Sequence, residues 1–169
     1  MIGVVSDTHD NVSAVERIVE KFEDEGVNTV IHCGDYIAPP VLPFLDTDAF
    51  ELHGVLGNND GEIEGLNAGF DAMDGTTLHG RFADLKLEDA RFAVLHGESK
   101  DEVEALAESG AYDYVLYGHY HVKEKRDVNG TTVINPGAHF PTVPDEHRTV
   151  ALIDTEKGGM DSVRFESVA

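Results

Sequence analysis

The heptapeptide Val115-Leu116-Tyr117-Gly118-His119-Tyr120-His121 joins a short β-type apolar run to a glycine and two histidines separated by one residue. Taken alone, a His-x-His pair is equally typical of a half-exposed strand, because alternate side chains of a strand point to the same face. Four other apolar runs of the chain also end in Asp, His or Asn. This repetition favours a metal site, of which the heptapeptide would be the last piece.

The four earlier apolar runs lie at residues 2–6, 27–33, 50–56 and 91–95. With the heptapeptide they deliver seven side chains that can bind a metal ion: Asp7, His9, Asp35, Asn58, His96, His119 and His121. In open α/β sheets, ligands gather at the carboxyl ends of the strands. We therefore expect Asp7 and His9, which follow the first run directly, to lie at such an edge.

The remaining pattern predicts strands alternating with helices first and hairpins later. Asp10-Asn11 provides an N-cap before apolar residues at helical spacing, a helix begins near Pro39, and Ser99 with Glu102 forms a capping box. Residues 61–75 contain four glycines and no clear period, so we expect a loop there, with room for a short helix near residues 62–67. Three hairpins are expected, formed by residues 82–87 with 91–95, 122–128 with 131–134, and 149–154 with 162–167.

The size and charge of the chain limit its partners. Its 169 residues suit a single domain spanning residues 1–169, and 12 basic against 33 acidic residues give a net charge of −21. So much negative charge disfavours nucleic-acid backbones and anionic membranes as partners. Because the acidic residues are interleaved with apolar runs, we interpret the charge as adaptation to a salt-rich cytoplasm, where screening removes the repulsion. A halophilic source is therefore our hypothesis.

Cysteine usage and hydropathy indicate a soluble cytoplasmic protein. The single cysteine, Cys33, cannot form an internal disulfide, and its place at the end of an apolar run suits a small buried side chain better than a reactive thiol. The chain opens on the apolar run itself, without a charged segment or a cleavage site. No apolar run approaches the ~20 residues that a membrane span needs.

The seven candidate ligands favour a borderline divalent ion. Carboxylates combined with imidazoles and one amide oxygen suit Mn²⁺, Fe²⁺ or Zn²⁺, whereas a Ca²⁺ site would be nearly all oxygen and a structural zinc site would use thiolates. Seven ligands are too many for one tetrahedral ion. Two ions that share one carboxylate would use them all.

Five motifs in this order and at these spacings resemble the signature of the calcineurin-like metallophosphoesterases: Asp7-x-His9, Gly34-Asp35, Gly57-Asn58, His96-Gly97 and Gly118-His119-x-His121. The small single-domain branch of that superfamily, the YfcE/MJ0936-type phosphodiesterases, is similar in length. Its Asn-Pro-Gly-Ser element is similar to residues 135–138, Asn-Pro-Gly-Ala. The resemblance spans almost the whole chain.

The resemblance implies an α/β fold of four layers, α/β/β/α, in which two mixed β-sheets pack face to face with helices on the outer faces. It also implies a phosphoric ester hydrolase, a phosphodiesterase that attacks phosphorus with a water or hydroxide bridging two divalent ions, with Mn²⁺ favoured over Ni²⁺, Zn²⁺ or Fe²⁺. One ion would be bound by Asp7, His9, Asp35 and His121. The other would be bound by Asp35, Asn58, His96 and His119, the four residues to which we assign catalysis, and Asp35 would be the bridge.

One position departs from the pattern of the larger members of the superfamily. Where they have a histidine placed to protonate the leaving group, this chain has Asn59, which cannot act as a general acid. Asp60 would ordinarily orient that histidine, so it would instead hold Asn59 or the loop. We therefore expect hydrolysis of phosphodiesters with good leaving groups rather than of unactivated monoesters.

The other histidines are expected to be structural. His32 would pack in its strand beside Cys33, and we expect surface or supporting positions for the rest: His53, His79, His139 and His147. His139 lies nearest the expected site, since it follows the turn at residues 135–137. The basic cluster of Lys123, Lys125 and Arg126 suits a solvated strand face, an anionic substrate or a subunit contact.

Two other functions compete with the phosphodiesterase. A retromer subunit related to this family keeps the fold as a binding scaffold after losing metal ligands, but all seven candidate ligands are present here. A nuclease for duplex DNA conflicts with the scarcity of basic residues. A small phosphodiester is thus the expected substrate, no membrane partner is expected, and exposed strand edges would permit a homo-oligomer.

Overall fold

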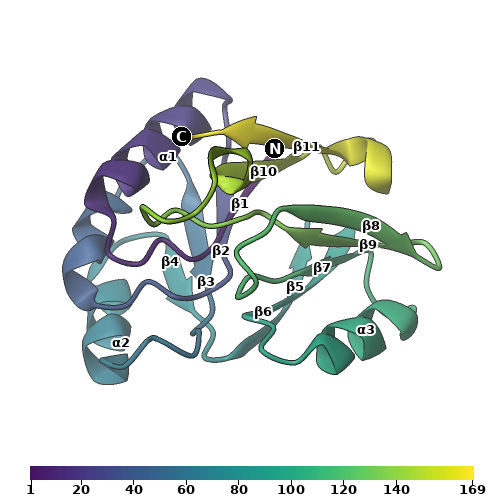
Figure 1. The fold of residues 1–169 in the computed structure, drawn as a ribbon, viewed down its shortest axis with the longest axis horizontal. Coiled ribbons are helices and arrows are strands. Elements are labelled where there is room, and N and C mark those ends of the chain that lie inside the picture. Colours follow the sequence, from purple (N-terminus) through teal and green to yellow (C-terminus); the bar gives the residue numbers. More distant parts are fainter.

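The computed structural model describes all residues from 1 to 169 and contains two mixed β-sheets. The first sheet has six strands in the order β11-β10-β1-β2-β3-β4, and the second has five in the order β5-β6-β7-β9-β8. The two sheets face each other, with α1 and α2 beside the first and α3 beside the second (Figure 1). The expected four-layer α/β/β/α architecture is therefore confirmed.

The first sheet combines a parallel centre with an antiparallel edge. β1 to β4 run parallel, β10 pairs antiparallel with β1, and β11 pairs antiparallel with β10. The strands are β1 (Ile2–Val5), β2 (Thr29–His32), β3 (Glu51–Gly54), β4 (Thr76–Leu78), β10 (Thr149–Ile153) and β11 (Val163–Ser167). The C-terminal hairpin expected at residues 149–167 is present, and it returns to the sheet in which the chain began.

The second sheet has parallel central strands β6, β7 and β9, flanked by antiparallel β5 and β8. Its strands are β5 (Phe82–Leu87), β6 (Ala90–Leu95), β7 (Tyr114–Leu116), β8 (Glu124–Val128) and β9 (Thr131–Asn135). The hairpins at residues 82–95 and 122–134 are confirmed, although Ala90, expected in a turn, is the first residue of β6.

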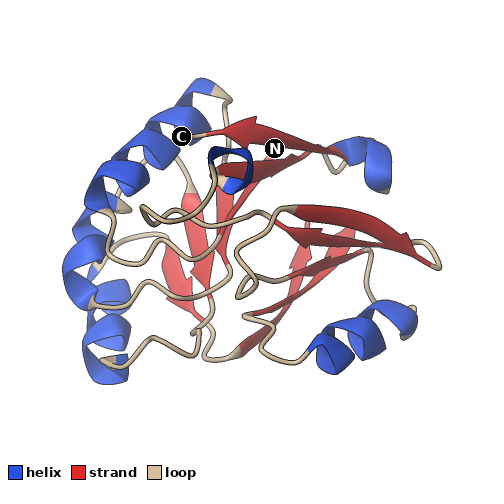
Figure 2. Cartoon of the chain, viewed as in Figure 1, coloured by secondary structure: helices blue, strands red, loops and turns tan.

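Helices cover the outer faces of both sheets (Figure 2). They are α1 (Val12–Asp24), α2 (Ile63–Ala72) and α3 (Lys100–Glu108), with short 3₁₀ helices η1 (Pro39–Phe44), η2 (Asp145–His147) and η3 (Met160–Ser162). The predicted caps are present, since the side chains of Asn11 and Ser99 accept hydrogen bonds from the backbone N–H groups of Ala14 and Glu102. None of the helices combines the length and apolar character that a membrane crossing requires.

Strand alternation divides the core into three apolar layers. In β1, Ile2 and Val4 face the second sheet, whereas Val5 packs with Ile18 and Phe22 of α1. In the second sheet, Phe92 and Val94 face inward, while Ala93 and Leu95 pack against α3. Each sheet therefore buries both faces, which explains its near-continuous apolar strands.

At residues 61–75 the short helix expected near residues 62–67 is present, but it is longer than expected: α2 has ten residues, so most of the region is helix rather than loop. Two of its side chains, Leu66 and Phe70, are fully buried against the first sheet and η1. The glycines obscured the helical spacing of the apolar residues in the sequence. Gly69 is nevertheless suited to the helix, because it packs so closely against Leu42 that an added Cβ would clash with that side chain. Tertiary packing here overrides weak helix propensity.

Candidate metal centre

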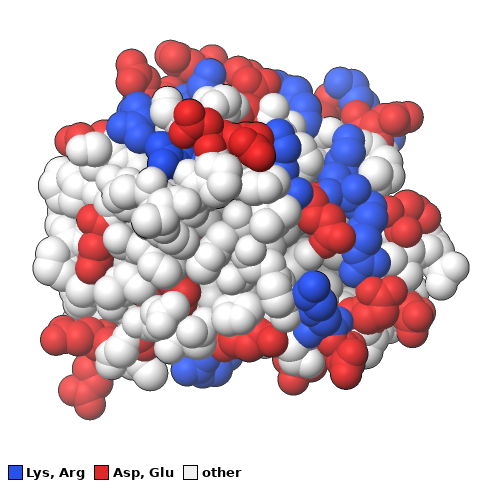
Figure 3. All heavy atoms as spheres, in the orientation of Figure 1, with Lys and Arg blue, Asp and Glu red and all other residues white.

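The loops that follow β1, β2, β3, β6 and β7 meet on one face of the molecule, where they run beside one another in the centre of Figure 1. The parallel pairing of β1, β2 and β3, and of β6 and β7, brings these carboxyl ends together. On this face, charged Asp, Glu, Lys and Arg side chains surround a centre that is largely free of them (Figure 3). The expected grouping of the seven candidate ligands occurs in this centre.

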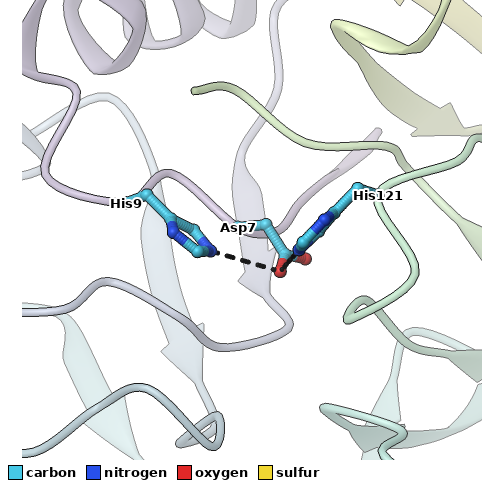
Figure 4. Close-up of side chains that lie close together, drawn as sticks. All are labelled: Asp7, His9 and His121. Carbon is cyan, nitrogen blue, oxygen red and sulfur yellow. Dashed lines mark ion pairs between the residues drawn. The ribbon is translucent and has the colours of Figure 1, made fainter. Parts of the chain in front are cut away.

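Asp7, His9 and His121 form one half of the group, with both imidazoles directed at the Asp7 carboxylate (Figure 4). Oδ1 of Asp7 lies 3.1 Å from Nε2 of His121 and 3.6 Å from Nε2 of His9. The aspartate is fully buried, and both histidines are partly exposed. The trio could hold one cation on the open side of the carboxylate.

Asp35 lies between the two halves of the group. Its Oδ2 is 3.3 Å from Nε2 of His9 and 3.3 Å from Nε2 of His96. His96 also faces Asp7, at 4.0 Å from Oδ1. A single carboxylate oxygen thus faces histidines from both sheets, which is the position that a bridging ligand requires.

Asn58 and His119 complete the second half. Nδ1 of His119 lies 2.9 Å from Oδ1 of Asn58, and the rings of His119 and His96 are 5.2 Å apart between centroids. Both the amide oxygen and the imidazole are more exposed than Asp35 and His96. All seven predicted site residues therefore lie in one continuous group.

Three buried polar atoms of the candidate ligands have no hydrogen-bond partner within the protein. They are Oδ1 of Asp7, Nε2 of His9 and Nε2 of His96. An unsatisfied buried polar atom is costly, and native proteins rarely tolerate several together. One free carboxylate oxygen and two free imidazole nitrogens, converging beside the Asp35 carboxylate, are a donor set that fits a borderline divalent cation.

Hydrogen bonds from neighbouring groups orient the side chains so that these free atoms face the site. Oδ2 of Asp7 accepts hydrogen bonds from Oγ of Ser6 at 2.5 Å and from the backbone N–H of His119 at 3.1 Å, which leaves Oδ1 for a ligand. Nδ1 of His96 donates to the carbonyl oxygen of Cys33 at 2.8 Å, so that Nε2 faces the group. Such outer contacts fix the tautomer and the orientation of metal-binding histidines.

Asn59, which replaces the expected histidine, binds Asp35. Its side-chain Nδ2 donates to Oδ2 of Asp35 at 2.7 Å, and its backbone N–H donates to Oδ1 at 2.9 Å. Asp60 is buried and accepts hydrogen bonds from the backbone N–H groups of Asp35, Ile37 and Gly57. The acid therefore holds the loops, one of the two roles expected for it.

The backbone of the site is unusual. Five of the seven candidate ligands have positive φ: Asp7 (54°), His9 (46°), Asp35 (60°), His119 (67°) and His121 (58°). Non-glycine residues rarely adopt this left-handed region, at a cost of order 1 kcal/mol or more each. Strain of this kind persists where the surrounding structure enforces it, and it clusters at functional sites.

Two glycines permit the close approach of the loops. A Cβ on Gly57 would overlap Oδ1 and the backbone nitrogen of Asp35, and a Cβ on Gly118 would overlap Ser6 and Oδ2 of Asp7. Glycine is thus required before Asn58 and before His119, because atoms of the neighbouring loop occupy the space where a side chain would lie.

The charges of the group shift one another's pKa values. Burial raises the pKa of Asp7 and Asp35, but the adjacent histidines outweigh it and hold both carboxyls well below their usual range. Burial lowers the pKa of His9 and His96, but contacts with the carboxylates outweigh it, raising the pKa of His9 to about 9 and that of His96 above its usual value. In the absence of a cation, the carboxylates therefore favour the protonated form of both imidazoles.

Most of the remaining histidines are structural, as predicted. His32 is fully buried beside Cys33, with Nε2 paired to Oγ1 of Thr8 and Nδ1 accepting from the backbone N–H of Gly34. His53 and His79 pair with each other at 3.0 Å between β3 and the end of β4. The surface position considered for His139 is wrong, because its side chain is only 2 % exposed.

Phe140 contributes to the site without a signal in the sequence. Its ring lies 4.7 Å from the rings of both His9 and His121, between centroids. The preceding turn is anchored by Asn135, whose side-chain amide donates to the carbonyl oxygen of Gly118 at 2.7 Å. The Asn-Pro-Gly-Ala element therefore stabilises the loop that carries His119 and His121, and it places the Phe140 ring against the histidines of the site.

The basic cluster at residues 123–126 is mostly engaged within the chain. Nζ of Lys125 donates to two backbone carbonyl oxygens, and Arg126 pairs with Glu104 at 2.7 Å. Neither side chain contacts a candidate ligand. Lys123 lies over the ring of Phe165, on the far strand β11.

The fold and the site define a class: a four-layer α/β/β/α protein with a histidine and carboxylate metal group at the carboxyl ends of its strands. The chain belongs to the calcineurin-like phosphoesterase superfamily, whose domain model matches residues 1–158. It is a metallophosphoesterase of that superfamily.

Three comparisons with known proteins illustrate the similarity. The chain is 34% identical over 159 residues to phosphodiesterase MJ0936 of Methanocaldococcus jannaschii, covering 92% of this chain and 93% of that protein. It superposes on the solved structure of an archaeal phosphodiesterase with a TM-score of 0.86 at 33% identity, covering 98% of each chain. Vacuolar Protein Sorting 29 from Cryptosporidium parvum shares the fold, with a TM-score of 0.63 at 14% identity, covering 98% of this chain and 96% of that one.

Proposed function

We propose that the protein is a phosphodiesterase that uses two divalent cations to hydrolyse a P–O bond of a small phosphodiester. The observation that carries the proposal is the position of Oδ2 of Asp35, 3.3 Å from the imidazoles of both His9 and His96. The phosphodiesterase relatives, at 34% and 33% identity over nearly the whole chain, support the same activity.

We assign one cation to Asp7, His9, Asp35 and His121, and the other to Asp35, Asn58, His96 and His119. When bound, two such cations polarise a phosphoryl oxygen and lower the pKa of a shared water toward neutrality. Carboxylate, imidazole and amide ligands together are compatible with several divalent ions, and we propose Mn²⁺, which the resemblance to the family favours over Ni²⁺, Zn²⁺ or Fe²⁺. Their positive charge also answers the objection that a chain of charge −21 should repel phosphate esters.

Side chains of the site position the groups that take part in the reaction. Asp35, held at both oxygens by Asn59, keeps the two halves of the site at a fixed separation. His119 and Asn58 lie on the more exposed side, where a phosphoryl group can approach. The Phe140 ring excludes water beside His9 and His121 and offers an apolar surface to an ester group.

The site lacks a general acid that could protonate the departing alcohol. Asn59 cannot supply it, and Asp60 is committed to three backbone N–H groups. We therefore propose a preference for diesters with good leaving groups, whose oxygens depart without protonation.

The proposal extends to the setting of the protein. A single metallophosphoesterase domain at residues 1–169 in a salt-rich cytoplasm accounts for the charge of −21. The strands at the sheet edges, β4, β11, β5 and β8, have one side without a strand partner, which supports a homo-oligomer. The acidic surface disfavours duplex nucleic acid as a substrate.

The test is hydrolysis of bis-p-nitrophenyl phosphate and p-nitrophenyl phosphate by metal-stripped protein in molar KCl, before and after addition of Mn²⁺. Diesterase activity should appear with Mn²⁺ and be lost in Asp35→Asn. The matched control is Asp71→Asn, on the exposed face of α2, which should keep the activity. Equal turnover of alkyl monoesters and aryl diesters would contradict the leaving-group preference.

The second candidate is a binding scaffold, since the fold is shared with Vacuolar Protein Sorting 29. The convergence of all seven candidate ligands favours the enzyme. Bound Mn²⁺ without hydrolysis of either ester, with Ni²⁺ and Zn²⁺ also inactive, would favour the scaffold.

A further inference from the structure

A second polar cavity lies beside the metal group, where the start of α1 meets the chain around η2. Its volume is about 280 Å³, and its lining includes Asn11, Arg17, His139, Arg148 and Val168. Basic side chains lie over α1 and beside η2 on this part of the surface, with acidic side chains next to them (Figure 3). No acidic side chain lines the cavity, although the chain has 33 of them.

Arg17 has no carboxylate partner. Each of the other five arginines forms an ion pair with an Asp or Glu, whereas Arg17 forms none and only donates through Nε to the carbonyl oxygen of Val168 at 3.3 Å. A free guanidinium in so acidic a protein is unusual. Its remaining N–H groups are available for a ligand.

Arg148 and His139 add unsatisfied groups to the same cavity. Arg148 pairs with Asp145 and donates to the carbonyl oxygen of Pro141, but its Nε is buried without a partner. His139 is only 2 % exposed, and neither of its ring nitrogens has a hydrogen-bond partner. A neutral imidazole carries one N–H donor, so it can serve an anion without being charged.

The first turn of α1 favours the same kind of ligand. Asn11 and Ala14 line the cavity, and the first turn has no acidic residue. The N-terminal end of a helix attracts negative charge. In addition, the Arg17 guanidinium keeps its terminal N–H groups for a ligand and Arg148 keeps its Nε–H, and such charged N–H donors match the oxygens of a phosphate.

We propose that this cavity binds a small oxyanion of the phosphate class, separately from the metal centre. Arg17 and Arg148 supply the charge and His139 one N–H donor. Inorganic phosphate and a small phosphomonoester share the chemistry that the cavity recognises, and both fit its volume.

The cavity is connected to the metal centre by residues 139–141. The backbone N–H of His139 donates to the carbonyl oxygen of Asp7 at 3.0 Å, and the next residue, Phe140, contacts His9 and His121. Hydrolysis of a phosphodiester yields a phosphomonoester, so the product belongs to the class that the cavity binds. This last link rests on the proposed function, whereas the oxyanion site does not.

The test is isothermal titration of metal-stripped full-length protein with inorganic phosphate and, separately, methyl phosphate, at constant molar KCl. Saturable binding should weaken by about tenfold or more in Arg17→Met and in Arg148→Met. Arg81→Met, which removes an arginine lining no part of this cavity, should bind as the unaltered protein does. Circular dichroism and melting temperature establish that each variant is folded.

The two ligands distinguish free phosphate from an esterified group, since tighter binding of methyl phosphate would identify the product as the natural occupant. Equal affinity in all four proteins, or binding only after Mn²⁺ is restored, would overturn the proposal by placing the anion elsewhere. Because the titration needs no catalysis, its outcome is independent of the diesterase assay.

Discussion

The side-chain amide of Asn59 donates a 2.7 Å hydrogen bond to Oδ2 of Asp35, the oxygen that faces both His9 and His96. The residue that occupies the position of a proton donor in larger relatives therefore positions a carboxylate here. It cannot protonate a leaving group, but it fixes the direction of the one side chain that faces both halves of the site.

Removing this amide should weaken metal binding. Asn59→Ala leaves the backbone N–H contact to Oδ1 but frees Oδ2, so the affinity for Mn²⁺ should fall by about tenfold, the lower end of the effect of losing such an outer contact. Titration calorimetry measures it. Asn67→Ala, on the exposed side of α2, is the matched control, and an unchanged affinity in Asn59→Ala would show that Asn59 has no positioning role.

Restoring a histidine should change selectivity rather than overall fold. Asn59→His supplies an imidazole able to protonate a leaving oxygen, so the ratio of alkyl to aryl diester hydrolysis should rise, by up to about a hundredfold. The slope of log kcat against the pKa of the leaving alcohol is the measurement. A slope equal to that of the unaltered protein would mean that the position does not reach the leaving group.

Gly118→Ala should also weaken metal binding, through Asp7 rather than through Asp35. The added methyl would meet Ser6 and Oδ2 of Asp7, so the carboxylate must move and the affinity for Mn²⁺ should fall by about tenfold or more. Gly61→Ala adds the same methyl in open space and serves as the control. Equal Mn²⁺ affinities in the two variants would contradict the close approach described here.

The metal-free protein should be most stable near pH 6.5, the usual pKa of histidine in an unfolded chain. The raised pKa of His9, about 9, stabilises the fold fully below pH 6.5, and this contribution is lost as the pH rises through 9. Burial lowers the pKa of His32 to about 3 and that of His139 to about 4, so their contribution is present above pH 6.5 and lost as the pH falls.

Melting temperatures in EDTA across this range would show the maximum. With Mn²⁺ present, the alkaline decline should disappear, because cation binding requires unprotonated imidazoles and strengthens as the pH rises. A metal-free melting temperature that still climbs from pH 6.5 to 9 would contradict the raised pKa of His9.

Salt should stabilise the protein. With a net charge of −21, raising KCl from about 0.1 M to about 1 M shortens the screening length from about 10 Å to about 3 Å and should raise the melting temperature. The exposed ion pairs, such as Arg91 with Asp84, contribute little to stability, so their screening by salt costs little. The halophilic hypothesis would be abandoned if the melting temperature were the same in both salts.

Much of the fold could be predicted from the sequence because each ligand follows a buried strand. The β-branched run at residues 2–6 and the cap at Asn11 are local signals, and they specified β1 and α1. The helix α2 was predicted only in its first half, because Gly65 and Gly69 are set by close contacts with Pro39 and Leu42 of η1, which no local pattern reveals.

The candidate metal ligands could be predicted from the sequence, but the residues that surround them could not. Regular motifs identified the seven candidate ligands, whereas Phe140 and Arg148 reach their places only through the turn after β9 and the chain around η2. The burial of His139 likewise depends on α1, more than a hundred residues earlier in the chain. Such placements are tertiary, so sequence spacing carries no trace of them.

The position of β1 between β2 and β10 has a consequence for the order of folding. Ile2 pairs with Ile153, so during synthesis β1 acquires its second neighbour only after all the residues between them have been made. The second sheet, built from residues 82–135 without interruption, can form earlier. During synthesis β1 therefore keeps an unpaired edge, and in a cell that edge, rather than the finished surface, is where a chaperone would be needed.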